Sequence, residues 1–234
     1  MKSTLVVLGH GPGISHSVAR HFGKLGHPVA IVARSEERLL KAAAELSQEG
    51  INAHVFAADL QSQDAVVKVT EKVREKLGPI GILHWNAYSP VEGSILEVAS
   101  DDLNYGFSIR VVSFITAVQA CIEDLEATCG AVLATSGVMA LSTPEIDAFS
   151  VEYGALAIGA AAQHKACGIL AKALQPRGVY VGELIVNGFV KGTEGAFDQA
   201  ATLDPDDIAD AFGALYSKRI DNSVVFGRVV NTMK

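Results

Sequence analysis

The stretch Thr4-Leu5-Val6-Val7-Leu8-Gly9-His10-Gly11-Pro12-Gly13-Ile14-Ser15 runs from an apolar segment through a glycine-rich turn into the start of a helix. Glycine tolerates positive φ in a tight turn and lets another group approach the backbone closely. The N-terminus of the helix that follows offers free N–H groups and positive potential to a phosphate. We therefore predict nucleotide binding at Gly9, Gly11, Gly13 and Ile14, with a plain strand-to-helix turn as the alternative.

Short apolar runs alternate with segments of helical period along the whole chain. Apolar runs of this kind are typical of strands in a parallel sheet that helices cover on both faces. The predicted strands are residues 4–8, 29–33, 53–57, 80–85, 131–135, 179–186 and 224–225. The pattern predicts an α/β fold, a doubly wound, Rossmann-like parallel sheet of about seven strands, in one domain over residues 1–234.

Capping residues mark three of the predicted helices. Ser35 stands before two glutamates, which suit a helix N-terminus. Ser62 opens a helical stretch that Gly78-Pro79 closes, and Asp204-Pro205 opens another over residues 206–217.

The composition excludes several classes of protein. Of the 234 residues, 49% are hydrophobic and 19% are charged, which predicts a folded core rather than disorder. The formal net charge of -7 and the lack of a basic run argue against nucleic acid as a partner. No apolar run approaches the roughly 20 residues of a membrane span, so we expect no membrane partner.

The three cysteines, Cys121, Cys129 and Cys167, lack the spacing of metal ligands. We interpret them as idle thiols of a reducing compartment and predict no metal site. Gly9 and Gly11 interrupt the first apolar run too early for a signal peptide, so we expect a cytoplasmic protein.

Three further positions strengthen the predicted nucleotide site, because each follows a predicted strand. Arg34 follows the second, where a guanidinium suits a ribose 2′-phosphate and a carboxylate would suit NAD. Asp59-Leu60 follows the third and Asn86-Ala87 the fourth, at the sheet edge where such folds bind ligands. The alternatives are a solvated arginine at a helix start, a turn-forming aspartate and a loop-capping asparagine.

With these residues the chain resembles the short-chain dehydrogenase/reductase family over nearly its whole length. The glycine turn is similar to the family's Gly-x-x-x-Gly-x-Gly, with Gly9 and Gly13 in place and Ser15 at the last glycine. The resemblance implies an adenine contact at Asp59 and a contact with the carboxamide end of the cofactor at Thr193. It also implies a preference for NADP(H) over NAD(H), through Arg34.

The catalytic tetrad of that family, Asn, Ser, Tyr and Lys, is degenerate here. Ser136 lies thirteen residues before Phe149, the family's spacing between serine and tyrosine, and matches the serine. Phe149 then falls at the tyrosine and Tyr153, four residues on and on the same predicted helical face, at the lysine. Arg110 falls at the asparagine. The resemblance thus implies catalytic roles for Ser136 and Tyr153 without the usual acid and cation.

Shifting the register restores no Tyr-x-x-x-Lys pair, because Ala157 follows Tyr153 at that interval. The alternative to a catalytic role for Tyr153 is a packing role. The alternative to a role in the site for Arg110 is an ion pair with a carboxylate at an interface. Tyr88 and His84 are candidate replacement acids, although His84, within an apolar strand, also suits a core histidine.

The predicted helix over residues 149–174 is rich in alanine and glycine, and the family commonly dimerises through this helix and the preceding one. The resemblance therefore implies a homodimer or homotetramer. Only residues 191–203 are available as a substrate lid, which implies a small or open pocket.

We expect an NADP(H)-binding oxidoreductase that transfers hydride to or from a small carbonyl or alcohol, if it is active. The competing hypotheses are a nucleotide-binding pseudoenzyme that senses cofactor or scaffolds a partner, and a vestigial fold that binds nothing. The sequence does not identify the substrate.

Overall fold

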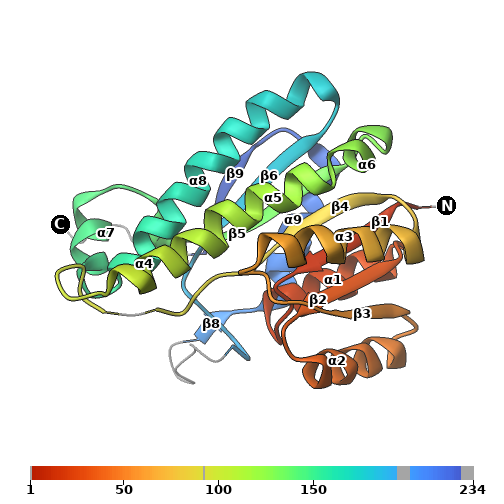
Figure 1. The fold of residues 1–234 in the computed structure, drawn as a ribbon, viewed down its shortest axis with the longest axis horizontal. Helices are drawn as coiled ribbons and strands as arrows, with labels where there is room; N and C mark the ends of the chain where they lie inside the picture. The colour runs from red at the N-terminus through yellow and green to blue at the C-terminus, as the bar shows by residue number, and fades with distance from the viewer. Residues whose placement is uncertain (1, 92, 194–200, 228–234) are drawn as a thin grey trace.

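A seven-stranded, wholly parallel sheet in the order β3-β2-β1-β4-β5-β6-β9 forms the centre of the molecule (Figure 1). The computed structural model describes residues 2–91, 93–193 and 201–227. The strands of the sheet are β1 (Thr4–Leu8), β2 (Val29–Ala33), β3 (Ala53–Ala57), β4 (Ile80–Trp85), β5 (Ala131–Gly137), β6 (Tyr180–Asn187) and β9 (Ser223–Gly227). The strand order reverses between β1 and β4, which is where folds of this class bind ligands.

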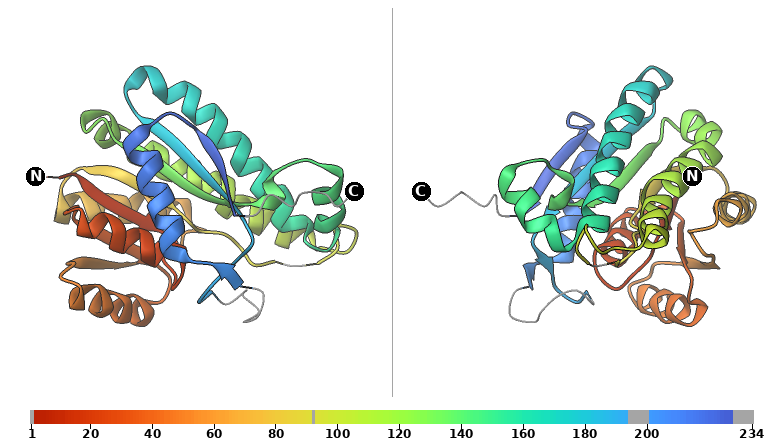
Figure 2. Two further views of the ribbon diagram at one scale, coloured as in Figure 1. Left: turned by 180° about the vertical axis from the view of Figure 1, so that it is seen from behind. Right: turned by 60° about the vertical axis from the view of Figure 1, so that its left-hand side comes forward.

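Helices cover both faces of the sheet, as Figures 1 and 2 show from opposite sides. One face carries α1 (Ile14–Lys24), α2 (Glu36–Gln48) and α9 (Pro205–Lys218). The other carries α3 (Gln63–Leu77), α4 (Ser100–Phe107), the π-helix η1 (Ser108–Ser113), α5 (Phe114–Ala120), α6 (Ile122–Ala127) and α8 (Gly154–Leu174). The remaining elements are short: η2 (Val138–Ala140), α7 (Pro144–Phe149), η3 (Ser150–Glu152), η4 (Gln175–Arg177), and the pair β7 (Phe189–Val190) and β8 (Ala201–Leu203).

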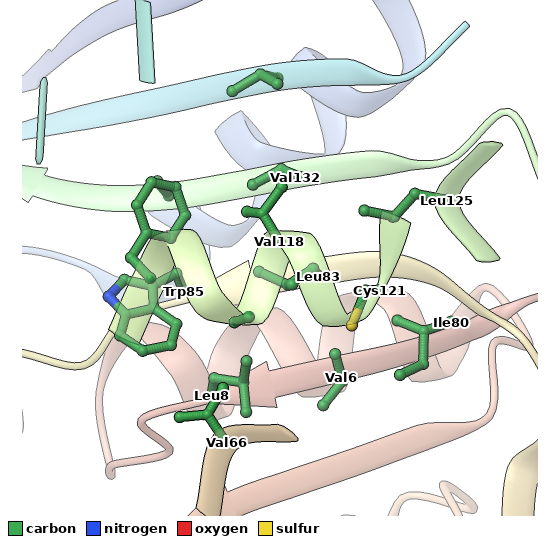
Figure 3. Packing of buried hydrophobic residues seen from close by; sticks show 14 of the residues in the cluster. Val6, Leu8, Val66, Ile80, Leu83, Trp85, Val118, Cys121, Leu125 and Val132 are labelled. Atoms are coloured by element: carbon green, nitrogen blue, oxygen red, sulfur yellow. The ribbon is translucent and has the colours of Figure 1, made fainter. Parts of the chain in front are cut away.

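The alternation of side chains along each strand divides the core into two layers. Leu5 and Val7 of β1 pack toward α1, α2 and α9, whereas Val6 and Leu8 pack toward α3, α5 and α8. Figure 3 shows the second layer, in which Trp85 lies among aliphatic and aromatic side chains of strands and helices. Both faces of the five inner strands are therefore buried, as the apolar runs predicted, whereas the edge strands β3 and β9 are partly exposed.

The predicted strands are confirmed, with small changes at their ends. β5 extends two residues beyond the prediction because Ser136 and Gly137 pair with Ile185 and Val186 of β6. Pairing across the sheet thus outweighs the weak strand preference of serine and glycine. The predicted caps are also confirmed: Ser35 and Ser62 accept backbone N–H bonds at the starts of α2 and α3.

Candidate active site

The glycine turn after β1 is held against the ends of the neighbouring strands. The N–H groups of Gly9 and His10 donate to the Val32 carbonyl, and Nδ2 of Asn86 donates to the Gly9 carbonyl at 3.3 Å. Gly9 has φ +89°, and a Cβ there would lie 2.5 Å from the Ala87 nitrogen. The close approach to Ala87, together with positive φ, therefore requires glycine at this position.

The start of α1 remains open toward a ligand. Its N-cap is Gly13, and no side chain caps it. Ser15, which replaces the family's last glycine, is buried and its Oγ accepts the Gly11 N–H at 2.7 Å, so it supports the turn from within. A Cβ at Gly11 would meet no atom within 4 Å, which leaves space beside the helix N-terminus for a phosphate.

His10 adds no positive charge to this turn. Burial lowers the pKa of its imidazole to about 3, and His16 lies edge-on at 5.5 Å between ring centroids. The potential that the turn offers to a phosphate therefore comes from backbone N–H groups and the end of α1.

Arg34 and Asp59 lie at the ends of β2 and β3, and both side chains are exposed. Within the described residues, no hydrogen bond or ion pair engages the Arg34 side chain, so it is free to bind an anion. Oδ1 of Asp59 accepts the Gln61 N–H at 3.1 Å, so this aspartate forms the turn that the alternative interpretation described. The side chain of Leu60 is buried in the core, so Leu60 has only backbone groups to offer a ligand.

Thr193, which follows β7, lies beside the glycine turn. Its Cγ2 would be 2.5 Å from a Cβ at Gly13, and its Oγ1 donates to the Val190 carbonyl at 2.8 Å. The ends of the predicted lid meet in the β7–β8 pair, where the Lys191 N–H donates to the Leu203 carbonyl at 2.9 Å. Residues 194–200 of the predicted lid lie outside the described residues.

Three buried hydroxyl groups occur in the segment after β4, near the carboxyl end of β5 and at the start of η3. Ser136, the second-last residue of β5, is 3% exposed, and its Oγ has no hydrogen-bond partner among the described residues. The hydroxyls of Ser89 and Ser150 are buried and unpaired in the same way. Buried polar groups without partners are uncommon, so a substrate or water is expected to bind them.

Phe149 and Tyr153 do not share a helix, and this part of the sequence prediction is wrong. Phe149 ends α7, η3 follows, and Tyr153 is the N-cap of α8 with φ -128° and ψ 31°. A backbone bridge to Gly93 holds Tyr153 out of helical geometry, with the Gly93 N–H donating to the Glu152 carbonyl at 2.9 Å. The two rings nevertheless lie near each other, 5.4 Å apart between centroids, and Phe149 is 54% exposed.

The opening turns of α8 contain no ionisable side chain. From Gly154 to Gln163 every residue is glycine, alanine, an aliphatic residue or glutamine, and His164 is the first that titrates. A tyrosine and a lysine one helical turn apart are therefore lacking in every register of this helix start.

Arg110 is buried within the chain, and the alternative of an ion pair at an interface stays a prediction. It lies in the π-helix η1, is 8% exposed, and no carboxylate among the described residues pairs with it. Its Cζ lies 5.3 Å from the centre of the Tyr88 ring, a cation–π contact. Burial lowers the pKa of the guanidinium to about 10, which leaves it charged at neutral pH.

His84 is excluded as a replacement acid. It is fully buried on β4, its ring contacts Phe212 at 4.9 Å between centroids, and burial lowers its pKa to about 3. It therefore stays neutral in the core beneath α9. Tyr88 is 53% exposed and remains a candidate proton donor.

The small residues of α8 pack within the chain. A Cβ at Gly154 would lie 2.7 Å from Cβ of Ile95, and one at Gly159 would lie 3.0 Å from Cδ of Arg110. Larger apolar side chains stand exposed on the same side of the molecule, namely Phe107, Val112, Ile158 and Ile169.

The described part of the chain gives no sign of two other kinds of site, a metal centre and a membrane span. It contains no group of three or more metal-ligating side chains, and none of its helices has the length and apolarity needed to span a bilayer. Cys121 and Cys167 are buried, and burial raises the pKa of both thiols. A hollow that Tyr180 and Arg219 help to line lies at the amino end of β6, at the opposite edge of the sheet from Ser136.

Comparisons with known proteins fit this geometry. A family model described as short chain dehydrogenase matches residues 3–199. A short chain dehydrogenase of Pseudocercospora fijiensis is 29% identical over 184 residues, 75% of this chain and 59% of the relative. The meso-2,3-butanediol dehydrogenase of Serratia marcescens is 30% identical over 138 residues, 58% of this chain and 54% of the relative. The chain spans 47–59% of the length of the first three curated relatives.

Solved structures show the same fold at low identity. A short-chain dehydrogenase/reductase from Serratia marcescens has a TM-score of 0.85 at 19% identity, covering 97% of this chain and 96% of that chain. A short chain dehydrogenase from Burkholderia cenocepacia, solved in complex with NADP, has a TM-score of 0.84 at 24% identity, covering 96% of each chain. At these identities the likeness shows the fold alone.

Proposed function

Because the chain belongs to the short-chain dehydrogenase family, we propose that it binds NADP(H) and acts as an oxidoreductase on a small carbonyl or alcohol compound. The observation that carries the proposal is the free, exposed Arg34 beside an open glycine turn at the reversal point of the sheet. The relatives and neighbours reported above include dehydrogenases and an NADP complex, which supports this proposal over the others.

The residues of the glycine turn fit the phosphates of the cofactor. Gly11 leaves open space, the start of α1 is uncapped, and Gly9 and Gly13 bring the backbone close to Ala87 and Thr193. Arg34 binds the 2′-phosphate through charge-assisted hydrogen bonds. Asp59 keeps one carboxylate oxygen free for the adenine, and Asn86 with Thr193 borders the path toward the nicotinamide.

Ser136 orients the substrate oxygen in this proposal, because its buried hydroxyl is unpaired at the carboxyl end of β5. When bound, the nicotinamide ring supplies the hydride chemistry. The chain itself supplies the proton through Tyr153, Tyr88 or water, since no acid lies in the opening turns of α8. Losing a positioned acid typically reduces rate by about 10²–10⁴-fold, so we expect slow turnover.

A nucleotide-binding pseudoenzyme is the second candidate function. The observation that favours it is the same lack of an ionisable residue from Gly154 to Gln163, together with the exposed Phe149. A protein of this kind binds NADP(H) through the intact turn and transfers no hydride.

The test is a titration with NADPH and NADH, followed by a screen of small aldehydes, ketones and alcohols. We expect tighter binding of NADPH, and the Arg34→Ala variant should lose about 1.5–3 kcal/mol of that preference. Lys41→Ala, which removes an exposed charge from α2, is the matched control and should keep it. Equal affinity for both cofactors would refute the role of Arg34, and binding without turnover would favour the pseudoenzyme.

We also propose that the chain forms a homodimer or homotetramer in the cytoplasm, with the exposed apolar residues on α4, η1 and α8 at the interface. Phe107, Val112 and Ile158 are each at least 41% exposed, and burying them against a second copy would remove apolar surface from water. Sedimentation equilibrium of the protein and of Val112→Asp tests this, and a monomeric parent protein would contradict it.

A further inference from the structure

Arg110 carries a buried positive charge that forms no ion pair with a carboxylate of the described residues. It is the only lysine or arginine among the buried residues that the structure describes. The other buried charged group on that side of the sheet, Glu183, acts on Arg110 only through space and raises a pKa that burial lowers; Oε2 of Glu183 is bound by Nδ1 of His164 at 2.5 Å and by Oγ of Ser223 at 3.1 Å, and its Oε1 has no hydrogen-bond partner among the described residues. An unpaired buried charge is costly, and native proteins seldom keep one without a function.

The surroundings of Arg110 hold its side chain in place without forming an ion pair with it. Gly159 leaves room for the arginine stem, since a Cβ at that position would lie 3.0 Å from Cδ of Arg110. The exposed ring of Tyr88 stacks on the guanidinium. Nε is enclosed without a partner, whereas the terminal nitrogens are not among the fully enclosed unpaired atoms of the described residues. The guanidinium can therefore donate hydrogen bonds to a molecule that enters beside Tyr88.

That molecule is not the charged part of the cofactor. The cofactor's negative charges are its phosphates, and the phosphate-binding turn lies at the start of α1, on the face of the sheet that carries α1, α2 and α9. Arg110 lies in η1, which packs against α8 on the opposite face. The nicotinamide riboside end carries no phosphate beyond the pyrophosphate, so an anion at Arg110 has to come from the substrate.

We propose that Arg110 binds a carboxylate of the substrate, so that the preferred substrates are oxo acids or hydroxy acids rather than neutral carbonyl compounds. This inference rests on the proposed function, because Ser136 is assigned the reacting oxygen of the same molecule. Arg110 takes no part in making or breaking bonds; its planar donors bind the carboxylate and thereby position the carbonyl. Asp147 and Glu152, the acidic residues nearest in sequence to Tyr153, are exposed, so solvent screens their repulsion of a substrate carboxylate.

The test compares phenylglyoxylate with its methyl ester, which differ mainly in charge. Each is titrated calorimetrically into the protein saturated with NADP⁺, which cannot reduce them, so binding is measured without turnover. We expect the acid to bind about 10- to 100-fold more tightly than the ester, because one charge-assisted hydrogen bond changes affinity by about that factor. Arg110→Met should bring the ratio of the two dissociation constants close to one, whereas Arg110→Lys should keep part of it.

Lys165→Met is the matched control, because it removes an exposed positive charge from α8 and should leave the ratio unchanged. If Arg110→Met does not fold, Arg110→Gln serves as the neutral variant. Equal binding of acid and ester by the parent protein, or an unchanged ratio in the neutral variant, would overturn the inference.

Turnover is measured separately with NADPH, so the two proposals fail in different ways. Preferential binding of the acid without reduction of either compound would refute the enzymatic function and leave the Arg110 site supported. If the protein binds no nicotinamide cofactor, the same titrations on the free protein still decide the role of Arg110.

Discussion

Replacing Gly9 with alanine should destabilise the whole fold, whereas the same change at Gly11 should not. At Gly9 the new Cβ would lie 2.5, 2.7 and 2.8 Å from the nitrogen, Cα and Cβ of Ala87, and φ is +89°. Backbone atoms of a strand end cannot rotate away, so the turn after β1 has to separate from the end of β4. A non-glycine residue at positive φ costs about 1–2 kcal/mol and overpacking about 1–3 kcal/mol. Together we expect a loss of about 2–5 kcal/mol from a free energy of unfolding of roughly 5–15 kcal/mol.

Gly11 supplies the matched control in the same turn. Its φ is not positive, and a Cβ there would meet no atom within 4 Å, so Gly11→Ala should change stability by less than about 0.5 kcal/mol. The added methyl group would instead occupy the space proposed for phosphate, and NADPH binding should weaken. Urea unfolding followed by circular dichroism measures the first effect and fluorescence titration with NADPH the second. Equal unfolding free energies for the two variants would refute the steric argument.

Three further predictions follow from single side chains. Tyr153→Phe should weaken NADPH binding by about 0.5–1.5 kcal/mol, and unchanged affinity would make Tyr153 a packing residue. Arg110→Met should raise the unfolding free energy of the ligand-free protein by about 1–3 kcal/mol, because it removes an unpaired buried charge, and a lower melting temperature would contradict this. The pKa of His84 falls from 6.5 to about 3 on folding, so the unfolded chain binds more protons than the folded chain between these pH values. The free energy of unfolding should therefore be full above about pH 6.5 and decrease below it. His84→Leu should reduce that slope by up to about 1.4 kcal/mol per pH unit, as measured by urea unfolding at several pH values.

The parallel sheet could be predicted from the sequence because its signals are local. Each strand is an apolar run such as Thr4–Leu8, and the helices begin at residues such as Ser35 and Ser62 whose side chains cap them. The glycine turn was predictable for the same reason, since its positive φ and close contacts depend on the residue type itself.

The start of α8 could not be predicted, because a contact distant in sequence determines it. The segment at Gly93 forms backbone hydrogen bonds to residues on either side of Tyr153 and so separates α7 from α8. Helical period and residue spacing carry no information about such a bridge. The small residues after Gly154 suit a helix whether it begins at Phe149 or at Gly154, so they do not mark its start. The burial of Arg110 was unpredictable for a related reason, since it depends on Gly159, forty-nine residues away.

The close contact between Gly159 and Cδ of Arg110 makes the order of substitutions matter. A larger residue at position 159 meets the arginine stem while residue 110 is arginine, but finds free space once residue 110 is shortened. Evolution or a designer can therefore reach a sequence with a short residue 110 and a larger residue 159 by changing residue 110 first, and the reverse order passes through a strained intermediate. The two positions should consequently be varied as a pair, and residues larger than alanine at position 159 should be recovered mainly together with a shorter residue 110.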